Sequence, residues 1–250
     1  MPTSKILRNL IIQSQKHETS FQDNQNNNNP VKHTISKHQN AKMTKLLKKA
    51  IFDLETSGLG QRCDILQMAL VDLAGKTKPW SQYMQPTQGI DPGASRVNKL
   101  TVVNDNLCYN GVRCKNVASP EEGIQNFVNH VTKHYPEGVV LIAHNGFRFD
   151  FPLLQRDLKN YDLVDDLKSR YRVELQDSLD IFRKHFPRLQ KYNQPYLVER
   201  FLVSDNVSDA HEAIGDCTNL KNAIEAAAKE KDMSVSEFLQ LPGRKITKLF

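Results

Sequence analysis

The sequence has few features of secreted, zinc-binding or membrane-spanning proteins. Its four cysteines form no CxxC pair and lack paired histidines at zinc-finger spacing, which favours free thiols in an intracellular protein over a structural zinc site. No apolar run approaches the ~18–20 residues of a membrane-spanning helix, so we expect no membrane partner. The composition, 39% hydrophobic and 25% charged, is that of a globular domain with an appendage.

The N-terminal segment is poor in acidic and in large apolar residues. The formal net charge is +6, and residues 1–48 carry all of this excess, with eight basic against two acidic side chains. Because a segment rich in Asn, Gln, His and Ser buries too little apolar surface to offset the entropy of ordering, we predict that residues 1–47 are disordered. The basic start MPTSKILRNLII also suits a mitochondrial targeting helix. We expect a cytoplasmic or nuclear protein, with mitochondrial import and a second start at Met43 as open alternatives.

From Lys48 onward, the apolar periodicity predicts an α/β domain. Three successive strands are followed by alternating helices and strands, which predicts a mixed sheet flanked by helices. Ser119 with Glu122 marks a helix start as a capping box, and Ser234 opens a last short helix in a C-terminal segment, residues 231–250. The expected strands are Ala50–Leu54, Ile65–Leu73, Pro79–Gln85, Val139–Ala143 and Ser178–Phe182, and the other expected helices are Phe151–Leu158 and Asp216–Ala228.

The first predicted strand, in the stretch AIFDLETSGLG, carries two carboxylates. Side chains alternate along a strand, so Ile51, Asp53 and Glu55 share one face. Two acids ~6–7 Å apart on a strand repel each other and lose hydration unless a cation lies between them. The stretch is therefore either a solvated acidic edge or half of a metal site.

Two later segments place further carboxylates at helix starts. LIAHNGFRFDFPLLQ puts Asp150 where a buried strand gives way to a helix, a position at which functional groups collect in open α/β sheets. DAHEAIGDCTNL contains His211 and Asp216, which lie about 140° apart on a regular helix. These two side chains converge only if His211 precedes the helix and Asp216 lies in an early turn.

Together these residues predict a two-metal centre. Asp53, Glu55, Asp150 and Asp216 supply oxygen donors, which suit Mg²⁺ or Mn²⁺ better than Zn²⁺. Two such ions ~3.5–4 Å apart can hold the attacking and leaving oxygens of a phosphodiester displacement. His211 suits a general base for the attacking water, because a histidine ordinarily has a pKa of about 6.5.

Three segments, FDLETSGL, HNGFRFDFPLL and HEAIGD, resemble in order and spacing the motifs of the DEDDh (DnaQ-like) 3′→5′ exonucleases. Within this family, HNGFRFDFPLLQ is most similar to the three-prime repair (TREX-type) and PML-type exonucleases. The stretch ASRVNKLT also resembles the family, although Asn98 stands where a histidine is common. The resemblance implies a ribonuclease H-like mixed sheet, with a three-strand antiparallel meander followed by parallel strands, in an exonuclease domain over residues 48–230.

The resemblance also implies roles for single residues. Asp53 would bridge two Mg²⁺ ions, for which Mn²⁺ can substitute, and the other three carboxylates would complete the ligand set. His211 would deprotonate the water that attacks the last phosphodiester, releasing nucleoside 5′-monophosphates from single-stranded DNA or RNA 3′ ends. The implied substrate contacts are two backbone positions, a wedge against the terminal bases and two polar side chains near the phosphate, which are Leu54 and Thr56, Leu59, and Asn145 and Arg148.

Several alternatives stay open at this point. A chain that kept the fold without activity would be a nucleic-acid-binding scaffold, although intact clustered acids argue against it, and an oligoribonuclease-like enzyme would act on short RNA. The choice between DNA and RNA depends on room for a 2′-hydroxyl. TREX-type relatives form dimers, and a homodimer is open here. The basic and aromatic stretch from Lys184 to Tyr192 suits a solvated loop or a single-strand path, and Asp177 suits an edge or cap role.

Overall fold

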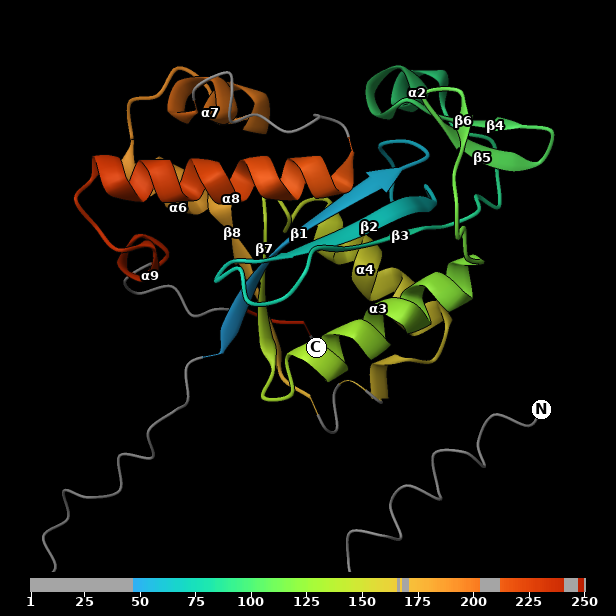
Figure 1. Ribbon diagram of the computed structural model, residues 1–250, viewed down its shortest axis with the longest axis horizontal. Helices are drawn as coiled ribbons and strands as arrows, with labels where there is room; N and C mark the ends of the chain where they lie inside the picture. The colour runs from blue at the N-terminus through green and yellow to red at the C-terminus, as the bar shows by residue number, and fades with distance from the viewer. Residues whose placement is uncertain (1–46, 166, 168–170, 203–211, 241–246, 250) are drawn as a thin grey trace, which may run out of the picture. The chain divides into compact units, whose positions relative to one another are not determined.

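The protein is described by a computed structural model over residues 47–165, 167, 171–202, 212–240 and 247–249. This part folds around a six-stranded sheet of order β3-β2-β1-β7-β8-β9 (Figure 1). The first three strands form an antiparallel meander, β7 and β8 run parallel to β1, and β9 is antiparallel to β8. The predicted fold class is confirmed. The strands are β1 (Lys48–Thr56), β2 (Ile65–Asp72), β3 (Trp80–Tyr83), β7 (Val139–Ala143), β8 (Val173–Asp177) and β9 (Thr247–Lys248).

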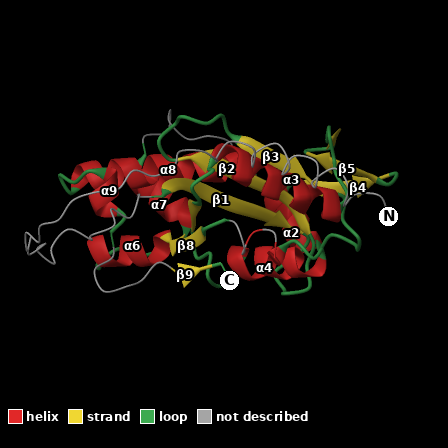
Figure 2. Ribbon diagram, turned by 90° about the horizontal axis from the view of Figure 1, so that it is seen from below, coloured by secondary structure: helices red, strands yellow, loops and turns green. Residues whose placement is uncertain are grey.

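Helices cover both faces of this sheet (Figures 1 and 2). The central strand β1 shows why: Phe52 packs into an apolar cluster with α3 and α4, and Ile51 packs into a second cluster with α6 to α9. Because side chains alternate along β1, Asp53 and Glu55 lie on the face of Ile51, which α8 covers. The helices are α3 (Pro120–His134), α4 (Asp150–Asn160), α6 (Ser178–His185), α7 (Gln194–Phe201), α8 (Ala213–Glu230) and α9 (Val235–Phe238).

A second, three-stranded sheet is formed by the part of the sequence between β3 and α3, and it was not predicted. Its elements follow helix α2 and pack two leucines, Leu100 and Leu107, against Leu66 of β2. Two-residue turns join the strands, with positive φ at Asn104 and Asp105 and at Asn110 and Gly111. Such turns are favoured in hairpins, and the pair Asn-Gly was a signal for the second of them in the sequence. The elements are α2 (Pro92–Asn98), β4 (Leu100–Val103), β5 (Asn106–Tyr109) and β6 (Val112–Arg113).

The predicted strand Ser178–Phe182 is wrong, because this segment begins helix α6. The strand is β8, which ends at Asp177, and the Asp177 carboxylate accepts the backbone N–H of Leu179 as a helix cap. The buried residues of α6, Ser178, Ile181 and Phe182, follow helical spacing, which the short apolar run concealed. The expected cap role of Asp177 is confirmed.

The ends of the other elements agree well with their sequence signals. The predicted helix starts at Ser119 and at Ser234 are confirmed, and each is a capping box. The C-terminal segment is part of the fold, since β9 pairs with β8 and Leu249 is buried in the core. The predicted disordered segment lies, except for Leu47, outside the described residues. Among the residues that the structure describes, no helix combines the length and apolarity needed to span a membrane.

Candidate metal-binding active site

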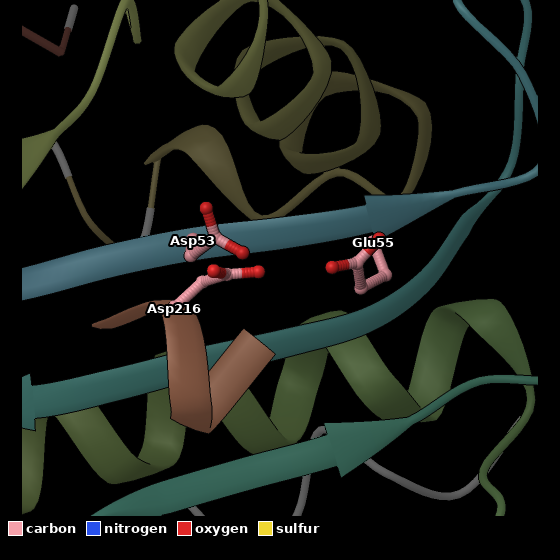
Figure 3. A group of neighbouring side chains, drawn as sticks. All are labelled: Asp53, Glu55 and Asp216. Carbon is pink, nitrogen blue, oxygen red and sulfur yellow. The ribbon is translucent and has the colours of Figure 1, made fainter. Parts of the chain in front are cut away.

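Three carboxylates from two elements meet on the α8 face of the sheet. Asp53 and Glu55 project from β1 and Asp216 from the first turn of α8, with ligand oxygens that all lie within 4.8 Å of one another (Figure 3). The N-terminus of α8 is fixed over the sheet by Gln67 of β2, whose Oε1 accepts the Ala213 N–H at 3.1 Å. A regular helix begun at this point brings Asp216 to β1, as the sequence interpretation required.

Asp150 also lies next to β1, at the edge where the pairing with β7 has ended. It is 5% exposed and lies at the start of α4, just after the buried strand β7. The pairing of β1 with β7 extends only as far as Ile51, and beyond it the Leu54 N–H donates to the Asp150 carboxylate. This contact places a fourth oxygen donor next to Asp53.

Burial and the neighbouring negative charges disfavour the ionised form of these carboxyl groups. Burial, followed by repulsion from Asp150, Glu55 and Asp216, raises the pKa of Asp53 well above its ordinary value. Burial, followed by the Asp216 charge, raises the pKa of Glu55 to about 8. Burial also raises the pKa of Asp150 to about 7. A divalent cation among these oxygens would remove the repulsion, and an all-oxygen donor set fits a hard cation such as Mg²⁺ or Mn²⁺.

These shifts predict that the metal-free protein loses stability as pH rises. A carboxyl with a pKa near 4.5 when unfolded and about 8 when folded favours the folded state at low pH, and this stability is lost as pH rises between the two values. We expect the Tm in EDTA to fall from pH 5 to pH 8, and Mn²⁺ to restore it. Glu55→Gln should flatten the pH dependence, whereas Glu121→Gln, on the exposed start of α3, should not. Equal slopes for wild type and Glu55→Gln in thermal unfolding would contradict the prediction.

Two amide side chains hold the carboxylates from outside the cluster. Asn98 of α2 donates from Nδ2 to the Thr56 carbonyl at 3.0 Å and also to the Glu55 carboxylate, while its Oδ1 accepts the Leu100 N–H at 3.1 Å. Gln194, the first residue of α7, donates to Asp216 Oδ1 at 3.2 Å and to the Asp216 carbonyl at 3.0 Å. The sequence marked Asn98 only as a departure from a family pattern, and it contained no signal for Gln194.

Asn98→Ala is expected to weaken Mn²⁺ binding by about 10–100-fold, because loss of a residue that orients a metal ligand has this order of effect. It also leaves two buried backbone groups without their partner, so a lower Tm should accompany the change. Calorimetry with Mn²⁺ measures the first effect. Asn126→Ala, which removes an exposed amide from α3, is the matched control. Wild-type Mn²⁺ affinity in a folded Asn98→Ala protein would show that Asn98 does not orient a metal ligand.

A tight turn before α4 is organised by Asp177. Its carboxylate accepts the backbone N–H groups of Asn145 at 2.8 Å and of Phe147 at 3.2 Å. A Cβ on Gly146 would lie 2.5 Å from the Ala143 Cβ, so the close approach of the turn to β7 requires glycine. These contacts hold the turn that leads from β7 to Asp150.

The basic and aromatic stretch next to this turn is partly fastened to the protein. His144 contacts the Tyr192 carbonyl through Nε2 at 2.6 Å. Lys184 donates to the Gln240 carbonyl, and His185 contacts the Phe238 carbonyl, so these two side chains have structural partners. Arg183 lies over the Tyr192 ring. The stretch borders the site, but several of its polar groups are already engaged.

Among the predicted substrate contacts, Leu54 and Thr56 are buried and flank Glu55 on β1. Leu59 is 92% exposed, which excludes simple packing within its loop. The loop that follows β1 and carries Leu59 is held by Arg156 of α4, which donates hydrogen bonds to the Gln61 and Cys63 carbonyls at 2.7 Å. Asn145 has φ 58°, and Arg148 is exposed in the same turn. The predicted general base, His211, lies outside the described residues, one position before the N-cap of α8.

This fold and its acidic cluster define a nuclease of the ribonuclease H-like exonuclease class. The profile of the family RNase_T (Exonuclease) matches residues 50–224, and the chain belongs to this family. The match contains β1 from Ala50 onward, α4 and the start of α8, and thus all four carboxylates of the site.

Two curated relatives match part of this chain. Exonuclease DPD1, chloroplastic/mitochondrial, of Arabidopsis thaliana is 26% identical over 215 residues, which is 80% of this chain and 62% of DPD1. Three-prime repair exonuclease 1 of Homo sapiens is 28% identical over 142 residues, which is 54% of this chain and 42% of the human protein. The chain thus spans less than two thirds of the length of either relative.

Solved structures show the same fold at low identity. A complex of E. coli exonuclease I with single-stranded DNA has a TM-score of 0.59 and 15% identity, covering 77% of this chain and 42% of exonuclease I. A complex of exonuclease X with 5′-overhanging duplex DNA has a TM-score of 0.50 and 21% identity, covering 76% of this chain and 97% of exonuclease X.

Proposed function

We propose that this chain is a Mg²⁺-dependent 3′→5′ exonuclease that releases nucleoside 5′-monophosphates from single-stranded DNA or RNA ends. The observation that carries the proposal is the meeting of Asp53, Glu55 and Asp216 oxygens within 4.8 Å, with Asp150 beside them, in a domain of the exonuclease family. The single-stranded DNA bound by exonuclease I supports the class of substrate.

The four carboxylates would hold two divalent cations. When bound, such ions stabilise the charge on the attacking and leaving oxygens of a phosphodiester displacement. Asp53 has carboxylate neighbours on both β1 and α8, which fits the position of a shared ligand. Asn98 and Gln194 would keep Glu55 and Asp216 turned toward the ions through their hydrogen bonds.

The remaining roles concern the substrate and the proton. His211 would take the proton of the attacking water, since a neutral imidazole is an effective base near pH 7. Leu59, which is exposed on a loop held by Arg156, would contact the terminal bases. The backbone of Leu54 and Thr56 would contact the terminal nucleotide, and Asn145 and Arg148 would lie near its phosphate.

Digestion of matched 3′-labelled and 5′-labelled oligonucleotides tests this proposal. Single-stranded DNA and RNA of the same sequence are incubated with Mg²⁺ or with EDTA. We expect Mg²⁺-dependent release of mononucleotides from the 3′ end, and the faster strand identifies the preferred sugar. A folded protein that binds DNA without cleaving either strand would instead be a scaffold, and cleavage of very short RNA alone would indicate an oligoribonuclease-like enzyme.

We also propose an intracellular location, in the cytoplasm or the nucleus. All four cysteines are free, as a reducing compartment would keep them. DPD1 is described as chloroplastic/mitochondrial, and the basic start of this sequence makes mitochondrial import the alternative to test. A fusion of residues 1–42 to a fluorescent protein distinguishes a cytoplasmic or nuclear location from mitochondrial import, because only a targeting segment would move the fusion into mitochondria.

A further inference from the structure

The segment of residues 92–115, from α2 through β6 and the two residues after it, exposes an unusual share of the large apolar side chains. We call it the β4–β6 module. Of the five large hydrophobic residues exposed in the described part of the chain, four belong to this module, and the fifth is Leu59. The four are Val97, Val102, Val103 and Val112, the last of which is 71% exposed. Single exposed valines are ordinary, but four in one short module indicate a surface that meets another molecule.

The same module has an excess of positive charge. It contains four basic residues and one acidic residue, Asp105, whereas basic and acidic residues are equal in number over residues 49–250 as a whole. All four cations are exposed, and none forms a salt bridge with another residue of the described chain. The cations are Arg96, Lys99, Arg113 and Lys115. Unpaired, exposed cations beside apolar side chains suit a polyanion with apolar faces.

The module is attached directly to the acidic cluster. Asn98 lies between Val97 and Lys99 and bonds both the Glu55 carboxylate and the Thr56 carbonyl. The Lys99 carbonyl accepts the Asn110 N–H at 3.1 Å, which brings Lys99 beside the turn that precedes Val112 and Arg113. Arg96 and Lys99, the basic residues nearest to Asn98 in the sequence, are therefore held close to the strand that carries two of the ligands, and Arg113 follows the turn beside Lys99.

A second border of the module lies toward the start of α8. Tyr83 contacts Glu212 through its hydroxyl at 3.5 Å. Burial, followed by the nearby Glu212, Cys114 and Tyr109, raises the pKa of the Tyr83 phenol, so Tyr109 of β5 and Cys114 lie near this contact. The module thus contacts Glu55 at one end and lies near Glu212, the residue that precedes α8, at the other.

We propose that the β4–β6 module is a second nucleic-acid contact surface, which binds the phosphates and bases of the strand beyond its terminal nucleotide. This inference rests on the proposed exonuclease function and adds to it a surface for long substrates. Arg96, Lys99 and Arg113 neutralise phosphates, and the exposed valines lie against bases or sugars. A trinucleotide occupies the cluster alone, whereas a longer strand also reaches the module.

The experiment compares the full-length protein with a variant that carries Arg96→Gln, Lys99→Gln and Arg113→Gln. Binding of a labelled 20-nucleotide single strand is measured in Ca²⁺ without Mg²⁺, over a range of salt concentrations, beside a labelled trinucleotide. The logarithm of the affinity falls linearly with the logarithm of the salt concentration, and each phosphate contact to a single strand adds ~0.7 to the steepness of this line. Loss of three contacts should therefore lower the steepness by about 2. The affinity gap between wild type and variant should then narrow roughly 20-fold between 50 and 200 mM salt.

A second variant controls for net charge. Lys133→Gln, Lys159→Gln and Lys229→Gln remove the same charge from exposed positions on α3, α4 and α8. The inference is supported if only the module variant loses affinity, and loses far more of it for the 20-mer than for the trinucleotide. It is overturned if the two variants have the same salt slope and affinity.

Two other results would also overturn the inference and are distinguishable from that one. If the wild-type protein neither binds nor digests single strands, the proposed function itself has failed. If the wild-type protein dimerises without nucleic acid, Val112→Asp makes it monomeric and strand binding is unchanged, the module is a surface for a second copy of the chain. Light scattering combined with size-exclusion chromatography measures this oligomeric state.

Discussion

Replacing Asp53 with asparagine is expected to lower turnover by at least ~10³-fold and to leave the protein folded. The stabilisation that bound metal ions supply in such a site is several kcal/mol, and about 4 kcal/mol corresponds to a factor of ~10³ in rate. After burial, the charges of Asp150, Glu55 and Asp216 raise the pKa of Asp53, so the charge of Asp53 interacts with every other carboxylate of the cluster. Asparagine keeps the shape of the side chain and removes this charge.

The same substitution should not cost stability in EDTA. Burial, followed by repulsion from the neighbouring metal-free carboxylates, raises the pKa of Asp53. A neutral asparagine avoids both the desolvation and the repulsion that an ionised side chain meets at this position. Hydrolysis rates are measured beside circular dichroism and thermal unfolding. Asp162→Asn is the matched control, because Asp162 is exposed and its φ of 55° is tolerated by asparagine. Wild-type turnover in a folded Asp53→Asn protein would remove the metal assignment.

His211→Ala is expected to lower turnover by about 10²–10⁴-fold, the range that a positioned general base contributes. Mn²⁺ binding should survive, since the ligands are carboxylates and the histidine handles a proton. The rate of the wild-type protein should rise with pH through about 6.5, the ordinary pKa of histidine, and this rise should be absent in the variant. Kinetics over pH 5–8 and calorimetry with Mn²⁺ measure both properties.

The control for His211→Ala is His134→Ala, on the opposite face of the sheet from α8. It should keep both turnover and metal binding. Loss of Mn²⁺ binding in His211→Ala would instead identify this histidine as a ligand or a support of the ligands. Normal turnover would show that another group accepts the proton.

Local signals in the sequence were sufficient to predict most of the strands and helices of the main sheet. The alternation in β1 placed Asp53 and Glu55 on one face, because the side-chain period of a strand does not depend on its neighbours. The apolar run of β7 and the capping box at Ser119 depend on a few adjacent residues as well. Where local signals conflicted, the prediction failed: Ser178–Phe182 is short and apolar, and it became helix α6 once Asp177 capped it.

By itself, the sequence determined which carboxylates are available and in what order the strands and helices follow one another. Only the tertiary structure decided what holds those carboxylates. Asn98 is 42 residues from Thr56, and Gln194 is 22 residues from Asp216. No periodicity or capping rule connects such positions, because these hydrogen bonds form only after the sheet and helices have packed. The exposed cations beside Asn98 likewise became a candidate surface only when the second sheet placed them at the edge of the site.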